Sequence, residues 1–538
     1  MTKRGDAVLS LNIIPERLRV RKWLLLFLLF IVVFGLVLSF ELARMSIVWD
    51  ETPHLDGGLL IYQGKLGEYF MFSRYPPLMD LFIAGYFGVF GTNVFAARLV
   101  SVTFALLTIA AVFVFATRAY GRRVAFISCL ILASMPGFIW LSRVSLLEMP
   151  LEFFFVSSLL LFLYWLNNGK NSAITICGLL LGVATLVKYQ AVVAGLVIIA
   201  ALPLLLYRSS LKPKISRLPL MIIGAAIILV PSFISIYSTG ILGQWIGLLQ
   251  SSDTLSNIYA ARFPTPIFYI LEMTQPLPNI HPINLIIFCL GIAGLVLFAW
   301  RHKPEDRLLF VWFLVVYLFF TLVATKSWRY VLPLFPVIAI SAASFIAYTY
   351  GKLQSIWRTK LNAANKKLIA KLLAGFLSVF TITAVFVSGI DAYNWFLADS
   401  TYVPLPEAAH YIANGFENAN ESVMIVCGVN TMNQKATSFY LAAYESKPNK
   451  VWLYPLEPAD TYAPNFNITQ LLIICKQNNV KYLLLYENKN QYFFHSTLNT
   501  VIVVESMIQS GEIYYQTAFG VQPNRIFIFQ FNQTALQT

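Results

Sequence analysis

The sequence predicts a polytopic α-helical membrane protein followed by a small α/β domain, and three observations lead to this fold class. Of the 538 residues, 58% are hydrophobic and only 12% are charged, and the mean hydropathy is +0.69. Soluble domains carry about 25% charged residues, so this composition excludes a soluble protein. Long apolar runs recur from residue 23 to residue 390, and beyond them the chain becomes polar and rich in asparagine.

A basic segment, residues 1–22, precedes the first apolar run, and no small-residue cleavage site follows it. We therefore interpret that run as an uncleaved helix. Spanning a bilayer takes roughly 20 apolar residues, and eleven runs within residues 23–390 are candidates. They are Trp23–Leu42, Phe95–Ala116, Val124–Leu141, Met149–Leu166, Ala173–Val187, Ala191–Tyr207, Leu218–Tyr237, Ile283–Trp300, Leu308–Ala324, Val331–Tyr350 and Leu368–Ile390.

The run Leu78–Phe90 is short and broken by two glycines. We expect it to lie at the outer interface, within a first outer loop of about residues 44–94, and a twelfth span is the alternative. With the N-terminus inside, the inner segments hold 23 of the 39 Lys and Arg residues. Cationic residues favour the cytoplasmic side, so the distribution predicts a multi-pass protein of the cell membrane with its C-terminus outside. The net charge of +14 follows this topology, and no basic domain with interleaved aromatics indicates a nucleic-acid partner.

Residues 391–538 alternate strand-like runs with helical ones. The strand-like runs are "SVMIVCG", "KVWLYPL", "KYLLLYE" and "RIFIFQF", and the helical ones are "PEAAHYIANGF" and "TQLLIICKQNN". Such alternation is typical of an α/β domain, which the topology places on the extracytoplasmic side.

Residues that are costly at membrane depth gather on the predicted outer side. The first outer loop carries Asp50, Glu51, His54, Arg74 and Tyr75, and later outer turns add Arg143, Glu148, Lys188, Arg262, His281, Lys326, Arg329 and Tyr330. Cationic side chains at that depth suit a phosphate, and a nearby carboxylate suits general-base work on an incoming hydroxyl or amine. The pattern predicts one composite pocket for a lipid-linked phosphate and a second substrate reached from outside.

The ordered motifs "WDE", "YPPL", "AARLVS", "SRVSLLEMPLEFF", "LVKYQA" and "KSWRYVLPLFP" resemble GT-C glycosyltransferases over about residues 20–350. The most similar branch is that of the protein O-mannosyltransferases and the lipid A aminoarabinose transferase, ArnT. The resemblance implies an inverting enzyme that moves a mannose- or pentose-like sugar from a polyprenyl-phosphate donor to a protein or glycolipid acceptor. The donor site and the acceptor site would both lie at the outer face, beside membrane lipid.

The resemblance also implies roles for individual residues. Asp50 would activate or orient the acceptor with Glu51 beside it, and Arg143 and Glu148 match a second acidic motif. The donor phosphate would meet Arg74, Tyr75, Lys188, Lys326, Arg329 and Tyr330; Tyr75 stands where the family often has Lys or His, so Arg74 would supply that charge. His54, His281 and Arg262 are weaker candidates for substrate contacts. No cofactor is required, and a divalent metal is compatible with the acids but not implied.

Other interpretations of these patterns stay open. The acids could cap helices, Arg143 and Glu148 could form a structural pair, and the lysines and tyrosines could anchor the chain at the interface. Among functions, an oligosaccharide ligase or oligosaccharyltransferase is an alternative enzyme. A transporter with an outer sensor domain and a non-catalytic lipid-binding component are alternatives from other classes. Protein Ser/Thr, a growing lipid-linked glycan and a lipid head group all fit as acceptor.

Overall fold

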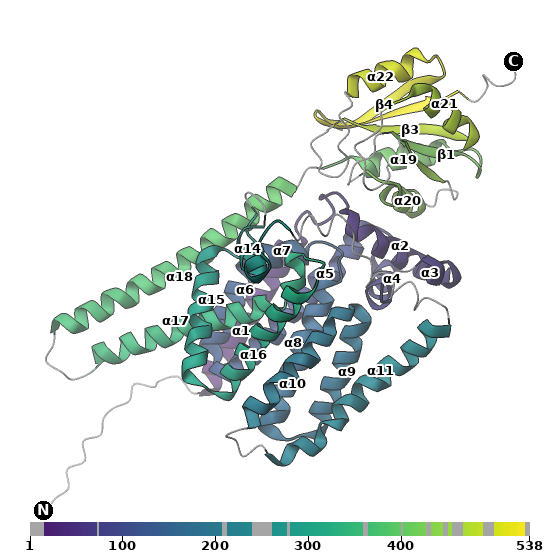
Figure 1. Cartoon of the computed structure of the whole chain (residues 1–538). Coiled ribbons are helices and arrows are strands. Elements are labelled where there is room, and N and C mark those ends of the chain that lie inside the picture. Colours follow the sequence, from purple (N-terminus) through teal and green to yellow (C-terminus); the bar gives the residue numbers. More distant parts are fainter. Residues whose placement is uncertain are drawn as a thin grey trace, which may run out of the picture.

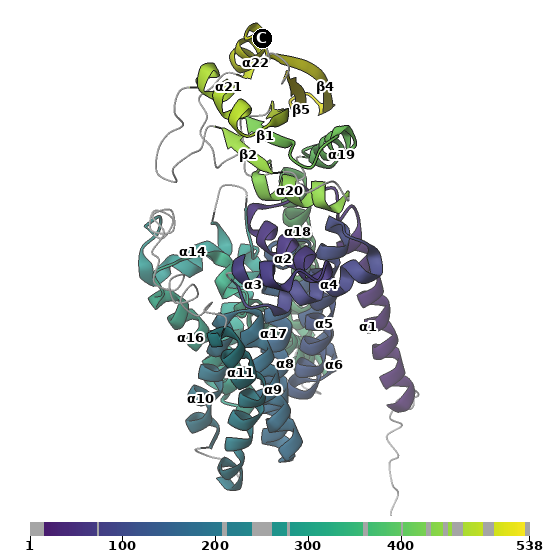
Figure 2. The same ribbon diagram turned by 90° about the vertical axis from the view of Figure 1, so that its right-hand side faces the viewer.

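A computed structural model of the whole chain shows a long helical body that carries a small sheet domain at one end (Figure 1). The structure describes residues 16–72, 75–206, 212–238, 261–276, 280–358, 364–399, 402–426, 432–444, 450–454, 466–487 and 500–532. We call the end of the helical body next to the sheet domain the outer end. The N-terminal ends of α1 and α11 and the C-terminal end of α10 lie at the opposite end (Figures 1 and 2).

The helical body is built from twelve helices within the described residues. These are α1 (Glu16–Ser39), α5 (Val94–Tyr120), α6 (Arg122–Ser134), α7 (Pro136–Ser142), α8 (Glu148–Asn168), α9 (Asn171–Val187), α10 (Val192–Leu206), α11 (Pro219–Ser238), α15 (Leu285–Arg301), α16 (Pro304–Leu322), α17 (Leu334–Arg358) and α18 (Ala364–Asp399). Every predicted span coincides with one of these helices, or with the pair α6–α7. The prediction of a mostly helical membrane fold is therefore confirmed.

Among the described residues, fewer than eleven helices have both the length and the composition of a membrane span. Six helices are long and apolar enough to cross a membrane, namely α1, α5, α8, α11, α17 and α18, and the bent pair α6–α7 makes a seventh. The pair bends by 72° where Met135 takes an extended conformation before Pro136, as proline requires of its predecessor. Of the other four predicted spans, α9, α10 and α15 are only 15–17 residues long, and α16 begins with the charged run Glu305–Arg307. The count of eleven stays a prediction.

Short helices cover the outer end of the body. The first outer loop forms η1 (Trp49–Glu51), α2 (Thr52–Tyr62), α3 (Leu66–Phe72) and α4 (Leu78–Phe90), and later turns form η2 (Tyr189–Ala191), η4 (Thr265–Ile267), α14 (Phe268–Thr274) and η5 (Trp328–Val331). A further 3₁₀ helix, η3 (Lys212–Arg217), lies between α10 and α11. The short run predicted to lie at the interface is thus α4, which packs on α2 at the outer end (Figure 2).

Two glycines allow α2 and α4 to pack closely. A Cβ atom at Gly57 would lie 2.5 Å from the Asp80 carboxylate, and one at Gly58 would lie 2.4 Å from the Ile83 side chain. Any larger residue at either position would push the two helices apart, since real Cβ contacts are never that short. The "DGG" in the first outer loop therefore has a packing role.

The sheet domain confirms the predicted α/β unit. Its elements are α19 (Leu405–Gly415), β1 (Ser422–Val426), α20 (Gln434–Ala443), β2 (Val451–Tyr454), α21 (Ile468–Gln477), β3 (Val480–Tyr486), α22 (Thr500–Gln509), β4 (Ile513–Val521) and β5 (Asn524–Phe531). The strand order is β2-β1-β3-β5-β4. Strands β2, β1 and β3 are parallel, and β5 pairs antiparallel with both β3 and β4.

The two faces of the sheet belong to different cores. Side chains alternate along a strand, so Leu484 on β3 points to one face and Leu483 and Leu485 to the other. The Leu484 face joins α19, α20 and the helical body in one continuous hydrophobic cluster, whereas the Leu483 face packs separately with α21 and α22. Figure 2 shows α20 lying between the sheet and α2. Helix α18, 36 residues long, continues past residue 390 and leads into this domain (Figure 1).

Candidate functional site

Asp50 is the exposed acid of the first outer loop. Its side chain is 47% exposed, and its Oδ2 accepts a hydrogen bond from Nη2 of Arg329 at 2.6 Å. Its Oδ1 accepts no hydrogen bond from any residue that the structure describes. Arg329 therefore holds one oxygen of a half-exposed carboxylate.

Glu51 has the opposite surroundings, although it is the next residue. Its carboxylate is fully buried and accepts four hydrogen bonds, two from the Arg98 guanidinium at 2.7 and 2.8 Å and two from the backbone N–H groups of Val48 and Ser145 at 2.9 and 2.7 Å. Arg98 is also fully buried and donates to the carbonyls of Leu42, Met45 and Ser46. Such a satisfied pair fixes the outer loop onto α5 and leaves no oxygen for a substrate.

A second acid–cation pair lies beside Asp50. Glu148 begins α8, and its carboxylate accepts a hydrogen bond of 3.0 Å from Nζ of Lys188, which follows the end of α9. The Lys188 ammonium also lies 5.1 Å from the centre of the Tyr330 ring. Two acids and two cations from four separate chain segments thus meet at the outer end.

Arg329 connects the two pairs electrostatically. Burial acts to lower the pKa of Arg329, but the negative charges of Glu148 and Asp50 outweigh it and hold the pKa above its usual value. Burial also raises the pKa of the Tyr330 hydroxyl, with a contribution from Tyr75, so these two phenols border the same cluster. We call Asp50, Glu148, Lys188, Arg329 and Tyr330 the Asp50 cluster.

His54 lies next to this cluster through Tyr75, with ring centres 5.1 Å apart. Nδ1 of His54 is 2.8 Å from Oδ1 of Asp80, and the Tyr69 hydroxyl donates to Oδ2 of the same acid at 3.0 Å. Sequence reasoning missed Asp80, although a single acid within the apolar run Leu78–Phe90 is a recognisable signal.

The remaining predicted site residues make other contacts. Arg143 donates to the carbonyl of Leu38 at 2.7 Å, at the end of α1, and does not pair with Glu148; burial lowers its pKa to about 10. Lys326 donates to three carbonyls at the end of α16, and burial lowers its pKa as well. Arg262 pairs with Glu272, and Nδ1 of His281 lies 2.8 Å from the Thr274 carbonyl oxygen. Arg74 lies outside the described residues.

A cavity of about 650 Å³ opens between the first outer loop and the sheet domain, and it is lined by Trp49, the chain neighbour of Asp50, but by no residue of the Asp50 cluster itself. Trp49 and Tyr75, which flank Asp50 and His54, form part of its wall, and α20 forms the opposite wall with Lys435 and Phe439. Asp56 also lines it and has no hydrogen-bond partner among the described residues. Burial raises the pKa of Asp56 to about 7, although Lys435 across the cavity acts to lower it. Lys435 could not be assigned from sequence, because only folding brings α20 to this loop.

Metal binding has no prearranged site in the part of the chain that the structure describes: no group of three or more His, Cys, Asp or Glu side chains there could hold an ion.

Comparison with known proteins places these features in a family context. Residues 74–234 match the family model described as dolichyl-phosphate-mannose-protein mannosyltransferase. No curated protein sequence matches the chain significantly. This match confirms the predicted resemblance to the protein O-mannosyltransferases over those residues.

The solved structures share the fold at low sequence identity. ArnT from Cupriavidus metallidurans in the apo state has a TM-score of 0.61 and 15% identity, with 96% of this chain and 99% of that chain covered. The same enzyme bound to undecaprenyl phosphate has a TM-score of 0.53 and 16% identity, with 95% of this chain and 98% of that chain covered. The archaeal oligosaccharyltransferase AglB from Archaeoglobus fulgidus, in complex with an inhibitory peptide and a dolichol-phosphate, has a TM-score of 0.52 and 13% identity. The match covers 85% of this chain and 69% of that chain. The fold of ArnT thus extends over nearly the whole chain, sheet domain included.

Proposed function

Since this multi-pass membrane protein has the fold of GT-C glycosyltransferases, we propose that it transfers a single sugar from a polyprenyl phosphate to an acceptor at the extracytoplasmic face. One observation carries the proposal: a half-exposed carboxylate, Asp50, is held through one oxygen by a cation that also faces a second acid–cation pair. The arrangement offers a base and two phosphate-binding cations within one site.

The proposed reaction is a direct displacement at the anomeric carbon of the donor. The acceptor oxygen or nitrogen forms the new bond to that carbon as the bond to the phosphate oxygen breaks, so the configuration inverts. Oδ1 of Asp50 takes the acceptor proton, since it accepts no other hydrogen bond from the described residues. The electron pair of the broken bond stays with the polyprenyl phosphate.

Arg329 and Lys188 would stabilise the departing phosphate. Each is held by a carboxylate in the structure, so the charges of the cluster balance before a donor arrives. A phosphate that draws Arg329 away from Asp50 would leave that carboxylate a better base, because a neighbouring cation lowers carboxylate basicity. Donor binding and base activation would then be coupled through one guanidinium.

The cavity between the outer loop and α20 would admit the acceptor. It is about 650 Å³ in volume and is lined by Trp49, Tyr75 and Asp56, the first of which is the neighbour of Asp50. An acceptor seated there would present its nucleophile beside the base.

The test is transfer of radiolabel from a set of polyprenyl-phosphate sugars to a membrane-extract acceptor by the purified protein. We expect label to reach the acceptor with wild type and to fall about 10²- to 10⁴-fold with Asp50→Asn. Glu68→Gln, an exposed acid of the same outer loop, is the matched control and should transfer normally. Wild-type rates from Asp50→Asn would overturn the assignment of the base.

Transfer of a preassembled glycan is the second candidate, favoured by the likeness to AglB. Presenting the purified protein with a polyprenyl-diphosphate oligosaccharide separates the two activities. Label transferred from that donor alone would replace our proposal with this one. No transfer from either donor type, with solute flux into liposomes, would favour the transporter.

A further inference from the structure

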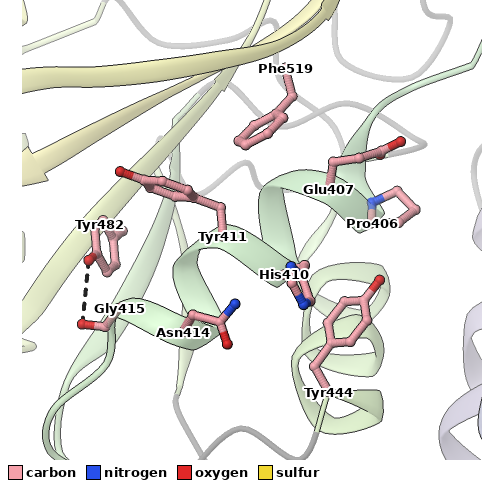
Figure 3. A pocket seen from close by; sticks show the side chains of 9 residues that line it. All are labelled: Pro406, Glu407, His410, Tyr411, Asn414, Gly415, Tyr444, Tyr482 and Phe519. Carbon is pink, nitrogen blue, oxygen red and sulfur yellow. Dashed lines mark hydrogen bonds between the residues drawn. The ribbon is translucent and has the colours of Figure 1, made fainter.

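An open groove of about 710 Å³ lies on the sheet domain, apart from the Asp50 cluster. One wall is the exposed face of α19, where Glu407, His410, Tyr411 and Asn414 follow each other at helical spacing. The other walls are Tyr444 at the end of α20, Tyr482 on β3 and Phe519 on β4. Figure 3 shows these side chains around the groove.

The aromatic rings of the groove are held in fixed positions. Tyr411 and Phe519 pack with centres 5.8 Å apart, and His410 and Tyr444 pack edge-on at 5.1 Å (Figure 3). Tyr482 hydrogen-bonds through its hydroxyl to the Gly415 carbonyl at 3.4 Å. Tyr411 and Tyr444 nevertheless stay 38% and 39% exposed, so both rings are presented to a ligand.

The chemistry of the lining selects one class of ligand. No lysine or arginine lines the groove among the described residues, so it lacks the donors that a phosphate or an acidic head group needs. It combines aromatic faces with a carboxylate, an imidazole and an amide. Aromatic faces cover the apolar C–H surface of a sugar ring, and the polar groups can pair with its hydroxyls. A neutral saccharide satisfies both requirements.

The groove and the catalytic region share one helix, α20. The backbone N–H of Val403, just before α19, donates to the Ser46 hydroxyl at 2.9 Å, close to Asp50 in the chain. Phe439 on α20 lines the cavity at the first outer loop, whereas Tyr444, directly after α20, lines the groove. Between them, Tyr440 is close enough to Arg98 and Glu51 for their charges to act on its hydroxyl. The groove and the cavity therefore lie at the same helix and its C-terminal end.

We propose that this groove binds the saccharide chain of a glycan acceptor, some distance from the hydroxyl that is to be modified. The role as acceptor site rests on the proposed glycosyltransferase function, whereas saccharide binding by the groove does not. The acceptor class is then a growing glycan rather than a protein hydroxyl or a bare lipid head group.

Equilibrium dialysis of the full-length protein in detergent against radiolabelled neutral oligosaccharides of two to five hexoses tests the binding. We expect Tyr411→Ala and Asn414→Ala each to weaken binding at least 10-fold, because both side chains are exposed in the groove. Tyr514→Ala removes an exposed tyrosine of β4 outside the groove and should bind as wild type does. Absence of oligosaccharide binding to wild type, or equal binding by all variants, would overturn the proposal.

A second measurement separates this inference from the proposed function. Asp50→Asn should keep full oligosaccharide binding, since Asp50 lies outside the groove. If transfer is observed, Tyr411→Ala should raise the KM for a glycan acceptor while the KM for the donor stays unchanged. Binding without any transfer activity would leave the groove intact as a saccharide site and refute only the enzyme. Tight binding of peptides in place of oligosaccharides would refute the groove assignment alone.

Discussion

Asp50 and Glu51 are adjacent acids, and each pairs with an arginine, yet their surroundings differ in every respect that matters for chemistry. Glu51 and Arg98 are fully buried, and all the oxygens of Glu51 are occupied. Asp50 and Arg329 are partly exposed, and one oxygen of Asp50 accepts no hydrogen bond from any residue that the structure describes. The comparison teaches that occupancy of the carboxylate oxygens, more than the pairing itself, separates a structural acid from a candidate base.

The largest expected effect comes from the partly exposed pair of Asp50 and Arg329. Asp50→Asn should lower transfer about 10²- to 10⁴-fold, the usual loss for a general base. The unfolding temperature in detergent should stay within about 2 °C of wild type, since exposed pairs contribute only about 0–1 kcal/mol. A variant that loses activity and stability together would place Asp50 with Glu51 as a structural residue.

Substitutions in the buried pair of Glu51 and Arg98 should lower stability and leave turnover unchanged. Arg98→Met leaves the Glu51 carboxylate buried without its cation, which typically costs about 3–5 kcal/mol of folding stability. Thermal unfolding should report the loss, while turnover per folded molecule is retained. Adding Glu51→Leu should restore part of the stability, because both buried charges are then gone. Loss of turnover by stable Glu51→Gln protein would move the base from Asp50 to Glu51.

Lys188 tests whether the second pair of the cluster meets the donor. Lys188→Met should raise the KM for a polyprenyl-phosphate sugar about 10-fold or more, since a hydrogen bond to a charged group contributes about 1.5–3 kcal/mol. Adding Glu148→Gln controls for the acid left unpaired. An unchanged donor KM in both variants would assign this pair to the scaffold, as for Arg98.

Lys326 is the matched cation for that experiment. Its ammonium already donates to three carbonyls at the end of α16, so it acts as a helix cap. Lys326→Met should lower stability by about 1–2 kcal/mol and leave the donor KM unchanged. Steady-state kinetics beside thermal unfolding distinguishes this result from a phosphate contact, which would raise the KM.

The smallest effect concerns Asp56 in the cavity. Its pKa is raised from 3.8 to about 7, so between these pH values the folded protein binds more protons at this site than the unfolded chain. Stability from this group is therefore greatest at low pH and is lost as the pH rises through that window. At pH 8, Asp56→Asn should raise the unfolding temperature on the order of 2 °C, and at pH 4 it should change it little. An equal change of the unfolding temperature at pH 4 and pH 8 would contradict the raised pKa of Asp56.

Much of the fold could be predicted because apolar runs and strand-like runs carry local signals. The helices of the body and the strands β1, β2, β3 and β5 all lie where the sequence predicts them. The sequence signal was too weak for α20, whose run "QKATSFYLAA" mixes polar and apolar residues without a strong period. Helix α20 packs against α19 and β2, which are its neighbours in the chain, and also against α2, which is far from it in sequence.

The sequence predicts at which turns the cationic side chains of the candidate site lie, but not which partners they contact. Arg143, Lys188, Lys326 and Arg329 all fall at outer turns, yet only Lys188 and Arg329 join the Asp50 cluster. The other two turn toward the carbonyls at helix ends, which need donors as much as a phosphate does. Sequence gives the position of a turn, and only packing decides which partner the cation reaches.

The bond between Ser46 and Val403 joins residues that are 357 positions apart. Ribosomes add about 5–20 residues per second, so the first outer loop waits roughly 20–70 seconds after synthesis before α19 and α20 exist to cover it. During that interval Phe87, which later packs against Phe439, has no cover from the sheet domain. We therefore expect an interval during biogenesis in which the first outer loop lacks its contacts with the sheet domain, and in which a chaperone that binds the loop would increase the fraction of correctly folded protein.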